Sequence, residues 1–196
     1  MLERCLALFL ALAEALQARD AFSGAHSLRV ASLAGTVGER LGWDEARLIR
    51  LRVGALLHDI GKLAIPARIL RKPGPLTKPE LERVRYHPVA GARLVQALAP
   101  ARATLACALY HHERWDGAGY PLGRSGGRIP PEARLLAVVD AFDAMTFGRP
   151  FRRQLTGDAA LAELDRCSGS QFEPAIVRAF VDAYDAGDVD LRRLAS

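Results

Sequence analysis

Residues 56–66 read LLHDIGKLAIP, a segment in which an apolar helix is predicted to stop beside a histidine–aspartate pair. Apolar residues precede the pair at the three- and four-residue steps of one helical face. Asp44 stands where it can cap the start of this helix. We therefore place His58 and Asp59 in the last turn of a helix that begins after Asp44.

The same helical periodicity runs through most of the chain. Thr77 and Glu80 match the spacing of a capping box, and Pro131 is well placed as the first residue of a helix. We find no internal repeat, low-complexity tract or convincing strand. The sequence predicts an all-α fold with one domain over residues 1–186 and a polar, frayed tail over 187–196. Helices are expected at about 5–16, 26–41, 44–61, 77–87, 89–98, 101–112, 157–167 and 174–185, with a further helix from 131.

Two proline- and glycine-rich stretches interrupt this pattern. Residues 66–79 form a connector between predicted helices. Residues 113–130 contain five glycines and two prolines, which predicts a long structured loop. Loops of this length in a compact domain are usually functional or disordered.

The composition is that of an ordinary globular protein. Half of the 196 residues are hydrophobic, and 27 lysines and arginines against 22 acidic residues give a net charge of +5. This modest excess suits an anionic ligand, but it equally suits the solvated surface of a basic protein. The three cysteines are widely spaced, which argues against a disulfide framework or a zinc–cysteine site and favours the reducing cytoplasm.

The N-terminal stretch CLALFLALAEAL, residues 5–16, needs a separate check because it resembles the core of a signal peptide. Glu3 cancels the charge of Arg4, and Glu14 interrupts the apolar run. The run is also shorter than the ~18 apolar residues that a membrane span needs. We interpret it as a buried helix and expect a soluble protein without membrane attachment.

The candidate chemistry lies in the five histidines, each at the edge of a predicted helix. Neutral imidazoles and carboxylates are typical ligands of manganese, iron, nickel and zinc. One histidine on an apolar face is more often a core residue, an isolated His-Asp pair is weak support, and Asp140 alone could be a satisfied buried aspartate. A single metal site, however, accounts for all of them together. The candidate ligands are His26, His58, Asp59, His87, His111, His112 and Asp140.

Two of these histidines are adjacent, which restricts where they can act. His111 and His112 would point about 100° apart on a helix. Both can reach one metal only near a helix end or an irregular turn. The glycine-rich loop that starts at Glu113 provides such an end.

At these residues the sequence resembles the HD-GYP family, a branch of the HD phosphohydrolase superfamily. The resemblance covers about residues 10–185 in the family's order, and its HHERWDGAGYP segment is much more specific than a lone His-Asp pair. The matching segments are RDAFSGAHSLRV (19–30), LLHDIGKLAIP (56–66), LRKPGPLT (70–77), YHPVAG (86–91), HHERWDGAGYP (111–121), RLLAVVDAFDAMT (134–146) and SQFEPAIV (170–177).

The resemblance implies a helical bundle of the HD phosphohydrolase type and a cyclic di-GMP phosphodiesterase with two or three metals, commonly iron or manganese. Asp59 would bridge two of these metals. One metal would be completed by His26, His58 and Asp140, and the other by His87, His111 and His112. A metal-bridged hydroxide would attack the phosphodiester.

The resemblance also assigns residues around the substrate. Lys62 should contact an oxygen of the scissile phosphate. Gly119, Tyr120 and Pro121 are the namesake triplet, which shapes the substrate loop in relatives and contacts regulatory partner proteins. Arg114 could hold a phosphate or a guanine edge, and a surface salt bridge is an equal alternative. Relatives often pair through helices, and an apolar N-terminal helix would serve a homodimer.

The chain departs from the family's pattern at two places. Phe22 stands where relatives with three metals have a glutamate, and because phenylalanine cannot be a ligand we predict two metals. The segment MTFGRPFRR (145–153) lacks some polar groups of its family counterpart, which affects substrate affinity or selectivity rather than the metals. The family domain would begin almost at residue 1, so we expect no sensor or receiver module ahead of it. Either the chain is a fragment or regulation comes from another protein.

Three functional hypotheses follow. The first is hydrolysis of cyclic di-GMP to linear pGpG, with GMP as a further product. The second keeps the chemistry but changes the substrate to another cyclic dinucleotide or to a nucleotide. The third is a non-catalytic signalling module that binds a nucleotide or a protein. A nucleic-acid polymer is not among the expected partners.

Overall fold

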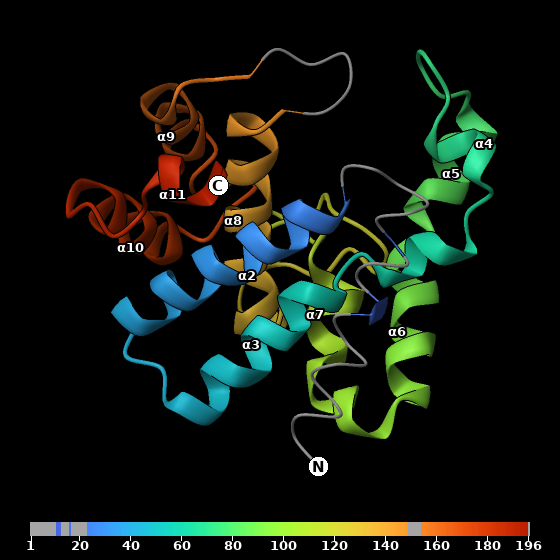
Figure 1. The fold of residues 1–196 in the computed structure, drawn as a ribbon, viewed down its shortest axis with the longest axis horizontal. Coiled ribbons are helices and arrows are strands. Elements are labelled where there is room, and N and C mark those ends of the chain that lie inside the picture. The colour runs from blue at the N-terminus through green and yellow to red at the C-terminus, as the bar shows by residue number, and fades with distance from the viewer. Residues whose placement is uncertain (1–10, 13–15, 17–22, 149–153, 196) are drawn as a thin grey trace.

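The computed structural model describes residues 11–12, 16, 23–148 and 154–195, and these residues are arranged almost entirely as helices (Figure 1). Phe22 and residues 149–153 lie outside the described residues, as does most of the N-terminal helix predicted over residues 5–16. Among the described residues the β-type pairing is limited to one isolated bridge between Ser168 and Phe172. The predicted all-α fold is confirmed. The elements are α2 (Ser23–Arg40), α3 (Glu45–Leu57), η1 (Ile60–Ala64), α4 (Ala67–Leu70), α5 (Lys78–Arg85), α6 (His87–Ala97), η2 (Ala99–Thr104), α7 (Leu105–Tyr110), η3 (Gly126–Arg128), α8 (Pro131–Thr146), α9 (Gly157–Arg166), α10 (Pro174–Asp185) and α11 (Leu191–Ala195).

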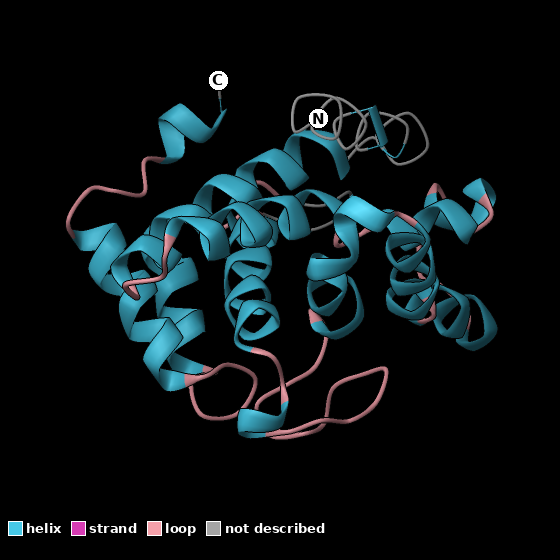
Figure 2. Cartoon of the chain, turned by 90° about the horizontal axis from the view of Figure 1, so that it is seen from below, coloured by secondary structure: helices cyan, strands magenta, loops and turns pink. Residues whose placement is uncertain are grey.

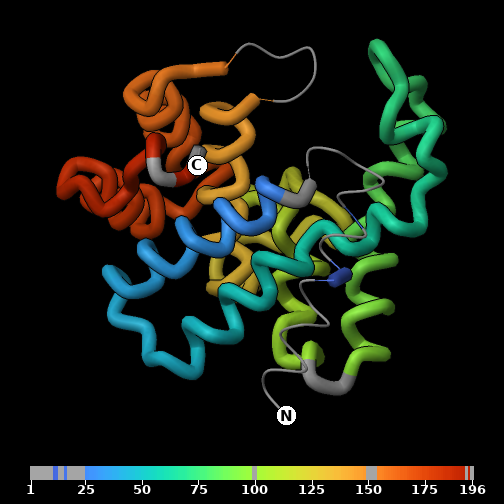
Figure 3. Tube along the Cα trace, viewed as in Figure 1, coloured from blue at the N-terminus to red at the C-terminus, as the bar shows by residue number. Residues whose placement is uncertain are grey.

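Local sequence signals explain where several helices begin. The Asp44 carboxylate accepts a hydrogen bond from the Arg47 backbone N–H at 2.8 Å and so caps α3. Thr77 and Glu80 form the predicted capping box at the start of α5. Gly42 adopts a φ of 70° after α2, and the chain turns there into α3, which the tube in Figure 3 shows as a helical hairpin.

Helices α2, α3, α8 and α10 surround the main hydrophobic core. Phe142 and Phe180 are fully buried in it, with ring centroids 4.6 Å apart. A smaller apolar cluster lies between the end of α3 and α6, around Leu57 and Val95. The helices α4 and α5 project on the opposite side from α9, α10 and α11 (Figure 1). Loops gather at one edge of the helical body, as Figure 2 shows.

The structure differs from the sequence predictions in four places. Helix α3 ends at Leu57 instead of near Gly61, so His58 and Asp59 follow the helix and do not form its last turn. The connector at 66–79 contains the short helix α4, and the helix predicted over 101–112 is divided into η2 and α7. The tail predicted as frayed instead contains α11, and Val189 is buried in the main core. Arg40 of α2 forms an ion pair with Asp188 at 2.7 Å. Leu191 and Leu194 also pack on the core, so their apolar contacts order this polar segment.

Candidate metal centre

Helix ends deliver most of the candidate metal ligands to one place. His58 and Asp59 follow α3, His87 begins α6, and the adjacent His111 and His112 follow α7. The predicted irregular turn after α7 is therefore present. His26 and Asp140 extend from within α2 and α8, which pack against each other. The structure brings all the sequence-predicted ligands together, in two adjoining groups.

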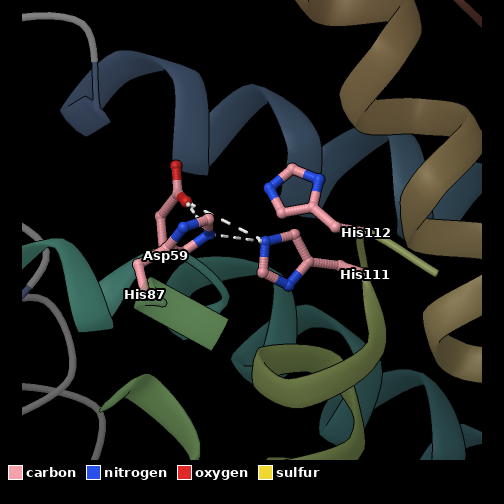
Figure 4. A group of neighbouring side chains, drawn as sticks. All are labelled: Asp59, His87, His111 and His112. Carbon is pink, nitrogen blue, oxygen red and sulfur yellow. Dashed lines mark hydrogen bonds and ion pairs between the residues drawn. The ribbon is translucent and has the colours of Figure 1, made fainter. Parts of the chain in front are cut away.

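The first group contains Asp59, His87, His111 and His112, whose ligand atoms lie within 4.8 Å of one another (Figure 4). Asp59 Oδ1 lies 3.2 Å from His87 Nε2 and 3.9 Å from His111 Nε2. The two Nε2 atoms of His87 and His111 are 3.1 Å apart. Four donor atoms from three separate segments thus converge on one point.

The second group contains His26, His58 and Asp140, within the same limit of 4.8 Å. Asp140 Oδ1 lies 3.1 Å from His26 Nε2 and 4.0 Å from His58 Nε2. Asp59 joins the two groups, because its Oδ2 lies 3.5 Å from His58 Nε2 while its Oδ1 faces His87. Each oxygen of this carboxylate therefore points to a different group.

Backbone carbonyls determine which nitrogen of three histidines faces the centre. The Nδ1 atoms of His58, His87 and His111 lie 2.6, 2.7 and 2.9 Å from carbonyl oxygens three or four residues earlier. A carbonyl can only accept a hydrogen bond, so Nδ1 carries the proton in each neutral ring. The lone pair of Nε2 is then directed at the centre, as in proteins that hold metals through histidine.

This arrangement fits a divalent cation better than it fits the side chains alone. Burial lowers the pKa of His58 and, much further, that of His111, so these rings are neutral. Burial likewise lowers the pKa of His112 to about 3. As metal ligands, His87 and His111 would carry the proton on Nδ1, which faces a carbonyl in each, and would turn the lone pairs of two Nε2 atoms 3.1 Å apart towards one another. A cation between them removes that repulsion, and the donor set binds divalent metal ions.

Comparison with known proteins agrees with this donor set. The model of the HD domain family matches residues 10–176. The chain belongs to the HD domain family. It is 42% identical over 172 residues to the cyclic di-GMP phosphodiesterase response regulator RpfG of Xanthomonas campestris pv. campestris, covering 87% of this chain and 46% of that protein. It is also 34% identical to the 3'3'-cGAMP-specific phosphodiesterase 3 of Vibrio cholerae, covering 86% of this chain and 36% of that protein.

The fold agrees with a solved structure as well. The HDG"Y"P protein Bd1817 of Bdellovibrio bacteriovorus superposes with a TM-score of 0.67 at 22% identity, covering 84% of this chain and 54% of that one. The predicted HD-GYP resemblance and the HD-type helical fold are confirmed. The chain spans less than half of the length of the two curated relatives named above. No helix in the described part is both long and apolar enough to cross a membrane.

The HD centre contains a second layer of charged residues that the sequence analysis missed. Asp143 Oδ2 lies 2.6 Å from His26 Nδ1, and the Asp143 side chain is only 1% exposed. Arg29 donates to both oxygens of Asp143, at 2.6 and 3.0 Å. Burial alone would lower the pKa of His26, but Asp140 and Asp143 outweigh it and raise this pKa to about 9. The available signal was spacing, since Asp143 follows Asp140 by one helical turn.

Lys62 lies against the HD pair. Its Nζ is 2.7 Å from Asp59 Oδ2. Burial works to raise the pKa of Asp59, but Lys62 and the neighbouring histidines outweigh it and hold this pKa well below its ordinary value. The carboxylate is thus ionised, as a metal ligand must be.

The loop of residues 113–130, called the GYP loop below, is attached to the centre at Glu113 and Tyr120. The buried Glu113 carboxylate accepts hydrogen bonds from the backbone N–H groups of Leu122, at 2.7 Å, and Arg124, at 3.0 Å. Tyr120 stacks on His112 with ring centroids 4.8 Å apart and precedes Pro121 through a cis peptide bond. This loop therefore holds His112 by ring contact. The role of Glu113 was also missed, because an acidic residue beside a charged loop gives no sign of burial.

Gly119, the first residue of the namesake triplet, allows the loop to close. A Cβ at this position would lie 2.4 Å from the Arg114 backbone nitrogen and 2.6 Å from the His112 carbonyl oxygen. Arg114 itself forms the salt bridge that was one of its two predicted roles. Its Nε and Nη2 donate to the Asp116 carboxylate at 3.1 and 2.7 Å.

Proposed function

We propose that this chain hydrolyses a phosphodiester bond of a cyclic dinucleotide, with cyclic di-GMP as the leading substrate and linear pGpG as the product. One observation carries the proposal. Asp59 belongs to the first donor group and also lies 3.5 Å from His58 of the second, and a cavity of about 400 Å³ that is lined by His111, His112 and Asp140 opens beside them. Membership of the HD family and the names of the relatives support this choice of chemistry.

The proposed site holds two divalent ions, iron or manganese. His26, His58 and Asp140 would bind one ion, His87, His111 and His112 the other, and Asp59 would offer one oxygen to each. When bound, such ions supply a deprotonated water at neutral pH and neutralise the charge that develops on the phosphate. Carboxylate and imidazole ligands suit both metals.

The chain's own residues then position and stabilise the phosphate. Asp59 keeps its charge because of Lys62, and Lys62 places an ammonium beside the reacting group. In our proposal this ammonium interacts with a phosphate oxygen as negative charge accumulates on it. Tyr120 and Gly119 line the cavity next to His112 and limit the access of water. Pro121, which follows Tyr120 in the same loop, is the third proposed substrate contact of the namesake triplet.

The remaining proposals concern the protein's surroundings. The free thiols of Cys107 and Cys167 suit the cytoplasm. Regulatory proteins would contact the GYP loop, where the Leu122 side chain is 58% exposed. A homodimer through the N-terminal helix that the sequence predicts over residues 5–16 completes this proposal.

A second candidate substrate is 3'3'-cGAMP. Relatives from Vibrio cholerae at 33–35% identity are named as specific for this cyclic dinucleotide. The metal centre alone does not separate the two substrates, because both present the same kind of phosphodiester. A competition assay with equal concentrations of both dinucleotides distinguishes them.

The direct test uses protein purified anaerobically, with Mn²⁺ or Fe²⁺ loading verified by elemental analysis. We expect turnover of cyclic di-GMP to pGpG, resolved by chromatography, and no turnover after treatment with a chelator. Metal-loaded protein that leaves cyclic di-GMP and cGAMP intact with either metal would refute the proposal.

Asp143→Asn is expected to weaken metal binding at the His26 group. The substitution removes the charge that orients His26, and losing such an outer partner typically costs about 10–100-fold in metal affinity. Manganese content after dialysis against graded chelator measures the effect. Asp188→Asn is the matched control, since it breaks another Arg–Asp pair of α2, that of Arg40, away from the centre. Equal manganese retention in the Asp143 and Asp188 variants would contradict this role.

A further inference from the structure

Two cavities meet at the metal centre and share a wall. Their volumes are about 400 and 240 Å³, and both are lined by His112, Asp140, Ala141 and Gln171. The first extends towards Arg114 and Tyr120, and the second towards Met145 and Phe172. Gln171 therefore lies at the boundary between two spaces beside the proposed metal centre, and under the proposed function these spaces are the ones open to the nucleoside parts of a cyclic dinucleotide.

The backbone holds Gln171 in this position. Its N–H donates to the Cys167 carbonyl at 2.9 Å, and its carbonyl accepts from the Trp115 N–H at 3.0 Å. The neighbouring Ser170 carbonyl accepts from the Asp116 N–H at 2.8 Å. The turn after α9 is thus hydrogen-bonded to the beginning of the GYP loop, on which the adjacent histidines stand.

The side-chain amide is oriented as well. Arg114 Nη1 donates to Gln171 Oε1 at 3.1 Å, while Nε and Nη2 of the same guanidinium are held by Asp116. Asp116 is fixed in turn by the Ala118 N–H at 2.9 Å. A guanidinium has only donors, so it selects the oxygen of the amide. The Gln171 NH₂ group faces away from Arg114, and within the described part of the chain it makes no hydrogen bond.

We infer that Gln171 selects guanine over adenine in the substrate and that Arg114 positions it for this task, an inference that rests on the proposed function. In guanine the N7 and O6 atoms are both acceptors, side by side, whereas adenine presents the N7 acceptor beside the N6 donor. A glutamine normally pairs with adenine through its oxygen and its nitrogen together. Here the oxygen is committed to Arg114. The remaining NH₂ group matches the guanine edge and opposes the adenine amino group.

Three substitutions separate this role from a general one. Gln171→Leu removes the donors, and Gln171→Glu replaces them with acceptors that match the adenine N6 amino group. Arg114→Ala releases the amide oxygen so that it can rotate towards adenine. The measured quantity is the ratio of kcat/KM for cyclic di-GMP to kcat/KM for cyclic di-AMP, with metal-loaded protein. Gln96→Leu is the matched control, because Gln96 is an exposed glutamine at the end of α6.

We expect the wild-type protein to favour cyclic di-GMP and Gln171→Leu to lower the ratio about tenfold, since a well-placed pair of base contacts gives about a five- to hundredfold preference. Gln171→Glu should invert the preference. Arg114→Ala should raise kcat/KM for cyclic di-AMP, while Gln96→Leu should match the wild type. The change should lie mainly in KM, because the base contact is present before and during the reaction.

Several results would overturn the inference. If Gln171→Leu keeps the wild-type ratio of the two kcat/KM values, the inference fails while the proposed function stands. The same holds if the wild-type protein does not prefer cyclic di-GMP to cyclic di-AMP. Bis(p-nitrophenyl) phosphate, a phosphodiester without a purine, reports the metal centre alone. If Gln171→Leu loses as much activity on this compound as on cyclic di-GMP, Gln171 acts through the metals and the inference fails. A wild type that hydrolyses no cyclic dinucleotide refutes the proposed function itself. Thermal unfolding of each variant identifies one that does not fold, and the ratio is then measured on the other Gln171 variant.

Discussion

Asp59→Ala is expected to abolish hydrolysis, lowering kcat by more than about a thousandfold, because the bound metals contribute several kcal/mol to the transition state. The side chain is 5% exposed, with Oδ1 at 3.2 Å from His87 and Oδ2 at 3.5 Å from His58. The substitution therefore removes a ligand from both proposed metal positions at once. It also removes the anion that Lys62 contacts at 2.7 Å.

Metal content and turnover should fall together in this variant. Elemental analysis after gel filtration gives the first quantity, and a cyclic di-GMP assay gives the second. Asp165→Ala is a suitable control, because Asp165 is exposed on α9 and distant from the centre in sequence. An Asp59→Ala protein with wild-type turnover would show that hydrolysis does not depend on Asp59 and would refute the proposed mechanism. One that keeps its full metal content would show that Asp59 does not bind the ions.

The sequence predicted the candidate metal ligands better than the residues that hold those ligands in place. Histidine is rare in this chain, and each of the five stands at the edge of a predicted helix or in its first or last turn, so the pattern could be read without coordinates. Asp143 could not be assigned in this way, because its partners His26 and Arg29 lie far along the chain. Glu113 could not be assigned because its backbone partners depend on how the following loop folds. Arg29, which holds Asp143, is separated from it by 114 positions.

The helix positions also divide into those set by nearby residues, which the sequence predicted, and those set by distant contacts, which it did not. Capping signals at Asp44 and Thr77 depend on residues three positions away, and they located α3 and α5 correctly. The C-terminal segment was predicted as frayed because it is polar. Its order comes from distant contacts, such as the burial of Val189 and the ion pair between Arg40 and Asp188. Local rules describe local interactions, and tertiary contacts decided the rest.

The contact between η1 and α6 leads to the second prediction with a large effect, for Gly61→Ala. A Cβ on Gly61 would lie 1.9 Å from the His87 carbonyl oxygen and 2.5 Å from the Gly91 backbone nitrogen. Both obstacles are backbone atoms, which cannot move aside as a side chain can. We expect a loss of about 3 kcal/mol or more in the free energy of unfolding, at the upper end of the range for overpacking. For a chain of this length the melting temperature would fall by roughly 6–12 °C.

The contact between η1 and α6 links the stability of the fold to the geometry of the metal centre. Alanine substitutions at two further glycines serve as comparisons. Gly61 stands two residues after Asp59 and touches the first residue of α6, so a shift of η1 from α6 lengthens the 3.2 Å contact between Asp59 and His87. Gly91→Ala probes the other side, where a Cβ would be 3.2 Å from the Gly61 nitrogen, and a smaller loss is expected. Gly127→Ala should be close to neutral, since no atom lies within 4 Å of its Cβ position. Melting in the presence of a chelator measures all three without a contribution from metal binding. If Gly61→Ala and Gly127→Ala have the same melting temperature, the close approach of η1 to α6 does not hold Asp59 and His87 together.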